Sequence, residues 1–164
     1  MEKQLQEQFH KAFYDLIKIA VEKNDHKYIV RLYTEIRDRL TNMLINKTGP
    51  TYQKIIADFD VPFFEQRLQH QVFDMNSMVS LVEMTFTYIH DLQMPIRDSV
   101  TAAAKSRVLE SKAIEEIVPM YIKEVHLILD TMEQDMKEFY ENREHPVVVE
   151  MLRKAVALQQ GRKT

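Results

Sequence analysis

Six histidines and many scattered carboxylates could supply metal ligands in this chain, but their spacing does not predict a metal site. His126 and Asp130 are four residues apart and would share one face of a helix, yet two ligands fall short of the three or four that hold a metal ion. A di-iron bundle needs Glu-x-x-His on two helices. That pattern occurs once, from Glu7 to His10. The sequence therefore predicts no metal site.

Covalent and phosphate chemistry are no better supported. The chain has no cysteine, so thiolate nucleophiles and disulfides are excluded. It has two glycines, Gly49 and Gly161, from which no glycine-rich phosphate loop can be built. None of its five serines lies in a nucleophile elbow. We therefore predict that the chain has no catalytic residue, binds no cofactor and is not an enzyme. The alternative, an enzyme that uses scattered carboxylates or histidines, would need a pocket in which titratable groups converge.

Acidic side chains are concentrated between residues 124 and 150, which contain eight acidic residues and only two basic ones, Lys137 and Arg143. Such a run can be simply the solvated face of a helix. It can also be a docking surface for a basic partner protein. The residues we assign to this candidate surface are Glu124, Asp130, Glu133, Glu138 and Glu141.

The segment Pro95-Ile96-Arg97-Asp98 is the most unusual short stretch. Pro95 fixes the start of a helix, and Asp98 in the first turn suits the positive end of the helix dipole. The planar guanidinium of Arg97 can bind a carboxylate on a neighbouring helix. We expect the segment to anchor the fold, with recognition of a partner as the alternative.

Composition excludes further classes. The chain has 164 residues with 22 basic and 25 acidic side chains, for a net charge of −3, which argues against nucleic acid as a partner. The first residues are too polar for a signal peptide, and no apolar run is long enough to span a membrane. We expect an intracellular, cytoplasmic protein, or a virion component if the source is viral.

The apolar spacing is helical almost throughout, which predicts an all-α fold of seven or eight helices in one compact bundle. The first helix is expected over residues 2–23, with Leu5, Phe9, Phe13 and Ile17 on its apolar face. Asp25, Asp60 and Asp74 are expected to cap later helices, and Gly49 to end one. Proline starts are expected at 50, 95 and 146.

Two points of the organisation stay open in the sequence. Pro119 either kinks a helix or starts a new one, because its ring clashes with the carbonyl four residues back. The first helix either packs inward or is offered to a partner, and its charge and hydrophobicity do not decide between these. We assign residues 1–160 to a single domain and residues 161–164 to a short polar tail.

Four segments in order resemble the helical core of the T-complex protein 11 family. The first runs from Tyr28 to Leu40 and is similar to the family's early leucine-rich helix. Ile56-Ala57-Asp58-Phe59-Asp60 is similar to the step before its next helix. Gln93–Asp98 resembles its Ala-Pro-x-Arg-Asp signature, with Met94 in place of alanine. The segment from Leu129 to Phe139 resembles its Leu-x-x-Met-x-x-Asp-Met-x-x-Phe helix.

The resemblance covers about residues 28–152, in a free-standing and shortened form. It implies a non-enzymatic helical scaffold or regulator linked to cyclic-AMP and protein-kinase-A signalling, with another protein as partner and self-association open. The alternative is a structural or assembly component of a large particle such as a virion. The motif positions, which we expect to be fold anchors, are Asp60, Pro95, Arg97, Asp98, Asp135, Met136 and Phe139.

Overall fold

The computed structural model describes residues 2–159, with the side chains of all of these except Ala155, Leu158 and Gln159. Over this range the chain forms eight α-helices, one 3-10 turn and no strand, which confirms the predicted all-α fold. The predicted tail, residues 161–164, lies outside the described residues. The elements are α1 (Glu2–Glu22), α2 (His26–Asn42), α3 (Pro50–Asp58), α4 (Val61–Gln69), α5 (Met75–Leu92), η1 (Pro95–Arg97), α6 (Asp98–Leu109), α7 (Ile114–Glu141) and α8 (Pro146–Gln159).

Aspartate caps begin three of the helices, as the sequence predicts. Asp25, Asp60 and Asp74 each accept a hydrogen bond from the backbone N–H three residues on, at 3.3, 3.1 and 2.8 Å. Each bond satisfies a donor that the helix itself leaves unpaired. The capping aspartates therefore predict correctly where α2, α4 and α5 begin.

Gly49 does not end a helix, and that prediction was wrong. The second helix stops at Asn42, and Met43 closes it in a right-handed conformation that needs no glycine. Gly49 is instead the residue before α3, where its extended backbone leads into Pro50. The proline supplies the helix start, because its missing N–H is one that a first turn leaves unpaired in any case.

Pro119 lies inside α7 and starts no new helix. A proline there removes the hydrogen bond to the carbonyl of Glu115. Glu115 is exposed, so water can take up that carbonyl, while Pro119 itself is buried against the bundle. The helix continues through this position because both of its neighbouring turns bury apolar side chains.

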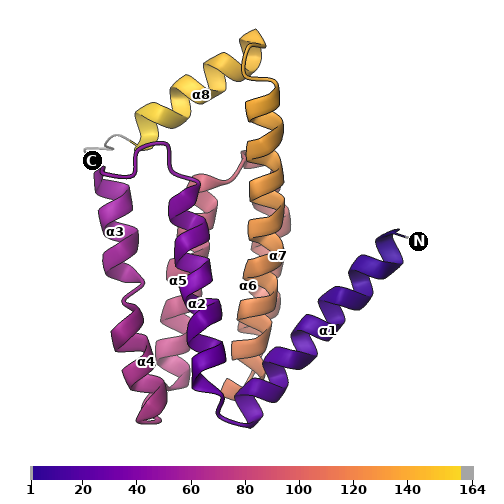
Figure 1. Ribbon diagram of the computed structural model, residues 1–164, viewed down its shortest axis with the longest axis vertical. Coiled ribbons are helices and arrows are strands. Elements are labelled where there is room, and N and C mark those ends of the chain that lie inside the picture. Colours follow the sequence, from indigo (N-terminus) through magenta and orange to yellow (C-terminus); the bar gives the residue numbers. More distant parts are fainter. Residues whose placement is uncertain (1, 160–164) are drawn as a thin grey trace.

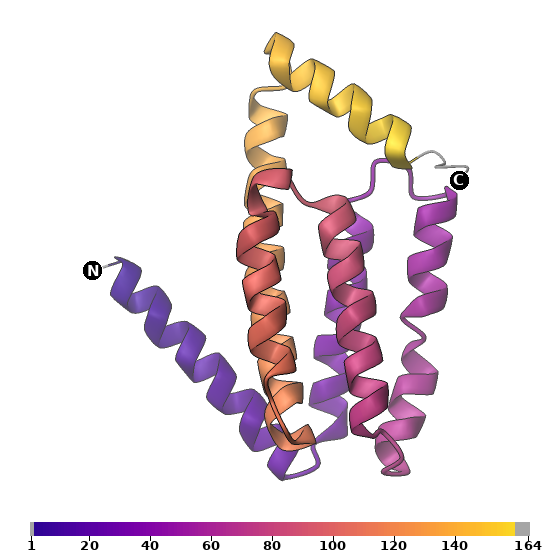
Figure 2. The same cartoon turned by 180° about the vertical axis from the view of Figure 1, so that it is seen from behind.

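The longest helix, α7, is the element around which the bundle is packed. It contacts α1, α2, α5 and α6, and Figures 1 and 2 show it running the length of the bundle. Burial of a continuous apolar face is what stabilises a helix in water. Its buried apolar residues include Ile117, Val118, Tyr121, Ile122, Val125, Ile128, Leu129 and Met132.

Aromatic rings join the shorter helices to this core. Tyr33 of α2 stacks on Phe64 of α4, with ring centres 3.9 Å apart. Phe73 meets Phe64 edge-on, and Phe59 lies between Tyr33 and Tyr88. Such ring pairs add to the stabilisation that burial gives. They hold α3 and α4 against α2 and α5.

The first and last helices are the least enclosed. The N-terminal half of α1 projects away from the bundle, and α8 crosses its end near the α2–α3 connection (Figures 1 and 2). Ile17 and Ala20 are the buried residues of α1. No buried residue is found among the described side chains of α8, although Val148, Leu152 and Val156 are half-buried. Val149 of this helix is exposed.

A buried hydroxyl pair in the core gives the first prediction. The Thr85 hydroxyl donates to the carbonyl of Leu81, so the Tyr121 hydroxyl, 2.8 Å away, must donate to Thr85. We expect Tyr121→Phe to lower the free energy of unfolding by about 1 kcal/mol, the net worth of one such bond. Urea denaturation followed by circular dichroism measures it.

The matched control is Tyr140→Phe, because Tyr140 is exposed on the same helix. We expect that change to stay within about 0.5 kcal/mol of the unmodified protein. A Tyr121→Phe protein as stable as the control would contradict the assigned bond.

Candidate functional site

Arg97 and Asp135, two of the predicted motif residues, form a bidentate ion pair. The Arg97 Nε lies 3.0 Å from Oδ2 of Asp135, and Nη2 lies 2.8 Å from Oδ1. The carboxylate is buried, with Asp135 only 5% exposed, whereas the guanidinium keeps contact with water. The hydrogen bonds and charge of Asp135 raise the pKa of Arg97. The pair ties η1 to the far part of α7.

The rest of the Pro95–Asp98 segment closes the turn between α5 and α6. Gln93 is buried, and its amide donates to Asp98 at 2.9 Å and to the Thr101 hydroxyl at 2.8 Å. His90 lies 3.6 Å from the other Asp98 oxygen. Pro95 begins the 3-10 turn, and its own surface is exposed. These contacts are internal to the fold.

The other predicted motif residues are not gathered with this pair. Asp60 caps α4. Met136 is exposed on α7, and Phe139 is half-buried one turn further on. The motif residues therefore do not converge on one site in the structure.

Two acids of the predicted docking surface are held by one arginine of α2. Arg39 binds both oxygens of Glu133 at 2.8 Å, and its Nη2 lies 2.6 Å from Oδ1 of Asp130. These bonds and charges raise the pKa of Arg39. Asp130 and Glu133 remain open to solvent, and the single charge of Arg39 offsets one of their two negative charges.

Glu124 does not belong to that surface. It is buried, and its carboxylate binds Arg107 of α6 at 3.2 and 3.3 Å. The helical period turns this position toward α6 while its acidic neighbours face water. Glu138 and Glu141 are exposed as expected. With Lys137 and Arg143 between and beside them, the charge of this part of α7 is close to balanced.

His126 is the third group that Arg39 contacts. Its Nδ1 lies 3.2 Å from the guanidinium, and its Nε2 lies 3.3 Å from the carbonyl of Leu32. A guanidinium can only donate, so Nδ1 must accept and Nε2 must carry the proton. Burial, followed by the nearby charge of Arg39, lowers the pKa of His126. The ring of Phe13 packs edge-on against it, so α1, α2 and α7 meet here.

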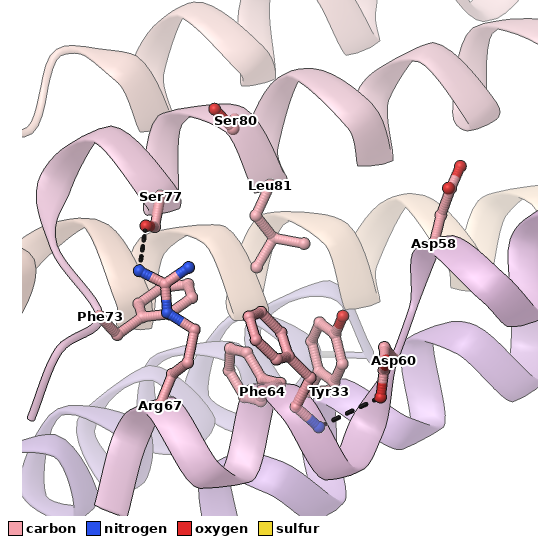
Figure 3. Close-up of a pocket in the computed structure, with 10 residues that line it drawn as sticks. Tyr33, Asp58, Asp60, Phe64, Arg67, Phe73, Ser77, Ser80 and Leu81 are labelled. Atoms are coloured by element: carbon pink, nitrogen blue, oxygen red, sulfur yellow. Dashed lines mark hydrogen bonds between the residues drawn. The ribbon is translucent and has the colours of Figure 1, made fainter. Parts of the chain in front are cut away.

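A hollow of about 280 Å³ opens between α2, α4 and α5. Figure 3 shows Arg67 with Ser77 at one side of it, Asp58 and Asp60 at the other, and Tyr33, Phe64 and Leu81 between them. The hollow brings together titratable groups, Arg67 with Asp58 and Asp60, of the kind that an enzyme would need.

The charged groups of this hollow already have partners. Arg67 donates to the Ser77 hydroxyl at 2.8 Å and to the carbonyl of Val72 at 3.0 Å. Asp58 accepts a hydrogen bond from Tyr88, and Asp60 accepts one from a backbone N–H. Burial, then the charge of Asp60, raises the pKa of Tyr33. The hollow is thus built from fold contacts.

Sequence reasoning did not single out two exposed apolar surfaces. One is the face of α1 made by Leu5, Phe9, Ala12, Leu16 and Ile19, which we call the outer stripe. The other lies around the α7–α8 turn, and we call it the C-terminal docking element: it consists of Met136 and Tyr140, which share a face of α7, with Val147 and Met151, which share a face of α8. The signal that could have found the outer stripe is its spacing of 4, 3, 4 and 3 residues, which is the heptad spacing of helix pairs.

The described part of the chain lacks two further kinds of feature. Among residues 2–159 no three His, Cys, Asp or Glu side chains are placed to hold a metal ion. Over the same range no helix combines the length and the apolar character needed to cross a membrane.

Comparison with known protein families gives a match over most of the chain. The family model described as T-complex protein 11 matches residues 1–150. The match extends over α1, which the four motifs did not cover. No solved structure matches the chain.

The Arg97–Asp135 pair gives the second prediction. We expect Arg97→Ala to lower the midpoint of urea unfolding clearly, because it leaves a buried carboxylate without its partner. Arg97→Lys should recover part of the loss, since one ammonium cannot bind both oxygens.

Arg153→Ala is the matched control, because its pair with Glu150 is exposed on both sides. An exposed pair of this kind contributes about 0.5 kcal/mol or less. If Arg97→Ala and Arg153→Ala had equal effects, Arg97 would not be an anchor.

His126 gives a prediction about pH. Its pKa is lowered in the fold, so below about pH 6.5 the unfolded chain takes up a proton that the folded protein resists. The free energy of unfolding should therefore fall as the pH drops from 7.5 to 5.5, by at most about 1.4 kcal/mol per pH unit for one proton. Above pH 6.5 this contribution is fully present.

Urea unfolding at several pH values measures this slope. The groups that face the ring are Arg39 and Glu35 of α2 and Asp130 of α7, none of which is changed in the test. His126→Gln should flatten the slope, whereas His70→Gln, at an exposed position, should leave it as it is. Equal slopes in the three proteins would refute a role of His126 in the pH dependence.

Proposed function

The chain belongs to the T-complex protein 11 family, and from this premise we propose that it is a non-enzymatic helical interaction protein that binds a regulatory partner through its C-terminal docking element. The observation behind this proposal is that α8 is poorly buried. It is a 14-residue helix without a buried residue among its described side chains. Helices this short are marginal in water unless one face is covered.

The surface beside α8 has the character of a binding site. Tyr140, 67% exposed, and Val147, 60% exposed, lie on either side of the turn that joins α7 to α8. Exposed tyrosine and methionine are typical of the centre of protein interfaces. Because the surrounding charges are of both signs, apolar contact rather than charge would hold the partner. A partner with an apolar groove fits this surface.

The state of the hollow between α2, α4 and α5 supports a non-enzymatic role. Its arginine and both carboxylates take part in contacts that hold helices or turns. The link of the family to cyclic-AMP and protein-kinase-A signalling is the finer part of the proposal, and it makes a component of that pathway the first partner to test.

A second candidate is an assembly role in a large particle such as a virion. What favours it is that the chain has two separate apolar surfaces, the outer stripe on α1 and the C-terminal docking element on α7 and α8. Two surfaces allow one molecule to contact two neighbours at once. An assembly component would be abundant in purified particles, which mass spectrometry can measure.

The fourth prediction separates folding from binding. Removing residues 146–164 should change the midpoint of urea unfolding little, because α8 buries no described side chain in the core. The same deletion should weaken partner binding at least about tenfold, since it removes the α8 half of the docking element. Val147→Asp with Met151→Asp should act in the same way as the deletion.

The probes are the purified regulatory and catalytic subunits of protein kinase A, titrated calorimetrically. The control is Val72→Asp, because Val72 is an exposed apolar residue in the turn between α4 and α5 and belongs to neither α7 nor α8. Binding that the deletion abolishes and the control keeps supports the proposal. If neither subunit binds, the signalling part is wrong. If the deletion unfolds the bundle, the assignment of α8 as a docking element is wrong.

A further inference from the structure

The outer stripe of α1 is an apolar surface that remains exposed among the residues that the structure describes. Leu5, Phe9, Leu16 and Ile19 are 52%, 65%, 57% and 45% exposed. At 100° per residue, these side chains and Ala12 fall within about 80° of each other around the helix. Phe13, Ile17 and Ala20 lie on the adjacent face and pack on the bundle. The helix therefore has two apolar faces side by side, and one of them is open to solvent.

The spacing indicates what covers the open face. Steps of 4, 3, 4 and 3 residues keep side chains along one line of a helix, where they interlock with a second helix that has the same repeat. The helix is 21 residues, or about 30 Å, long, which is enough for almost three heptads. Its N-terminal half stands clear of the bundle in both views, so a second helix has access (Figures 1 and 2).

We propose that the outer stripe is a self-association surface, on which α1 of a second copy of this chain packs in the antiparallel direction. In that arrangement Phe9, the largest side chain of the stripe, lies level with Ala12, the smallest, of the second copy. Leu5 lies level with Leu16 in the same way. The two-fold symmetry repeats each contact, so the surface is complementary to itself.

The polar flank of the stripe agrees with this register. On the solvent side the helical period places Gln8 and Asp15 next to the stripe, and the antiparallel register brings the Gln8 amide of one copy to the Asp15 carboxylate of the other. A shift by one heptad would place the two Asp15 carboxylates against each other, which is unfavourable. A parallel pair would stack Phe9 on Phe9 and Ala12 on Ala12, so packing would be uneven along the stripe.

A lipid surface suits the stripe less well than a second helix. Helices that lie on anionic membranes have polar faces rich in Lys and Arg. In α1 the charges are mixed, with Glu2, Glu7, Asp15 and Glu22 against Lys3, Lys11 and Lys18. The helix has a slight negative balance, which an anionic membrane would repel.

Oligomeric state is the first test. Analytical ultracentrifugation of the full chain, over a wide concentration range, should show a species of twice the chain mass of 19.5 kDa. Leu16→Glu should give the mass of one chain with unchanged helicity, because Leu16 is exposed in the fold. Ile96→Glu, the matched control at an exposed apolar site on η1, should remain a dimer. A monomer in the unmodified protein would overturn the proposal.

Disulfide trapping tests direction and register, and the absence of natural cysteine makes it specific. Leu5→Cys and Leu16→Cys proteins, mixed and oxidised, should form the mixed disulfide, and each alone should form little. Efficient self-crosslinking of Leu16→Cys would show a parallel pair and overturn the register. Binding of a monomer to anionic vesicles, lost in Leu16→Glu, would overturn the choice of occupant. Neither outcome affects binding at α8, which uses other residues.

Discussion

The structure depends on the burial of one continuous face of α7. A single helix in water gains little from its own hydrogen bonds, so each short helix of this chain is stable to the extent that it covers apolar surface on another. The first, second, fifth and sixth helices all do so on α7. The third and fourth reach the core indirectly, through the aromatic contacts of Tyr33 with Phe59 and Phe64. The last helix covers least.

Ion pairs fix the register in which the other elements pack along α7. Arg39, Arg97 and Arg107 each bind a carboxylate of α7 from a different element. Apolar contacts alone leave helices free to slide by a turn, but a guanidinium that binds both oxygens of one carboxylate is satisfied in a single register. Four of the eight acids of α7 are therefore structural: Glu124, Asp130, Glu133 and Asp135. Part of the negative charge that the sequence concentrates here is thus offset by arginines of the same chain.

Local signals in the sequence were sufficient for much of the fold. The caps at Asp25, Asp60 and Asp74, and the proline starts at 50 and 146, depend on neighbouring residues alone, and the structure places them as expected. Pro95 instead begins a 3-10 turn, and the α-helix expected there begins three residues later, at Asp98. Predictions that depend on what lies across a helix interface were less secure. Glu124 reads as one more surface acid until Arg107 is placed opposite it. The first helix has two adjacent apolar faces, and only the fold shows which one the bundle covers.

The turn that leads into α8 has a mechanical consequence. Between Asn142 and His145 the chain is held by hydrogen bonds to nearby backbone, and the imidazole of His145 accepts from the N–H of Val147 at 3.2 Å. A force on α8 reaches the bundle through this short joint and the final turns of α7, and through the half-buried Val148, Leu152 and Val156. Reorienting the helix would cost local bonds of the joint and spare the apolar interior. The turn about which α8 would move is therefore separate from the apolar packing that stabilises the bundle.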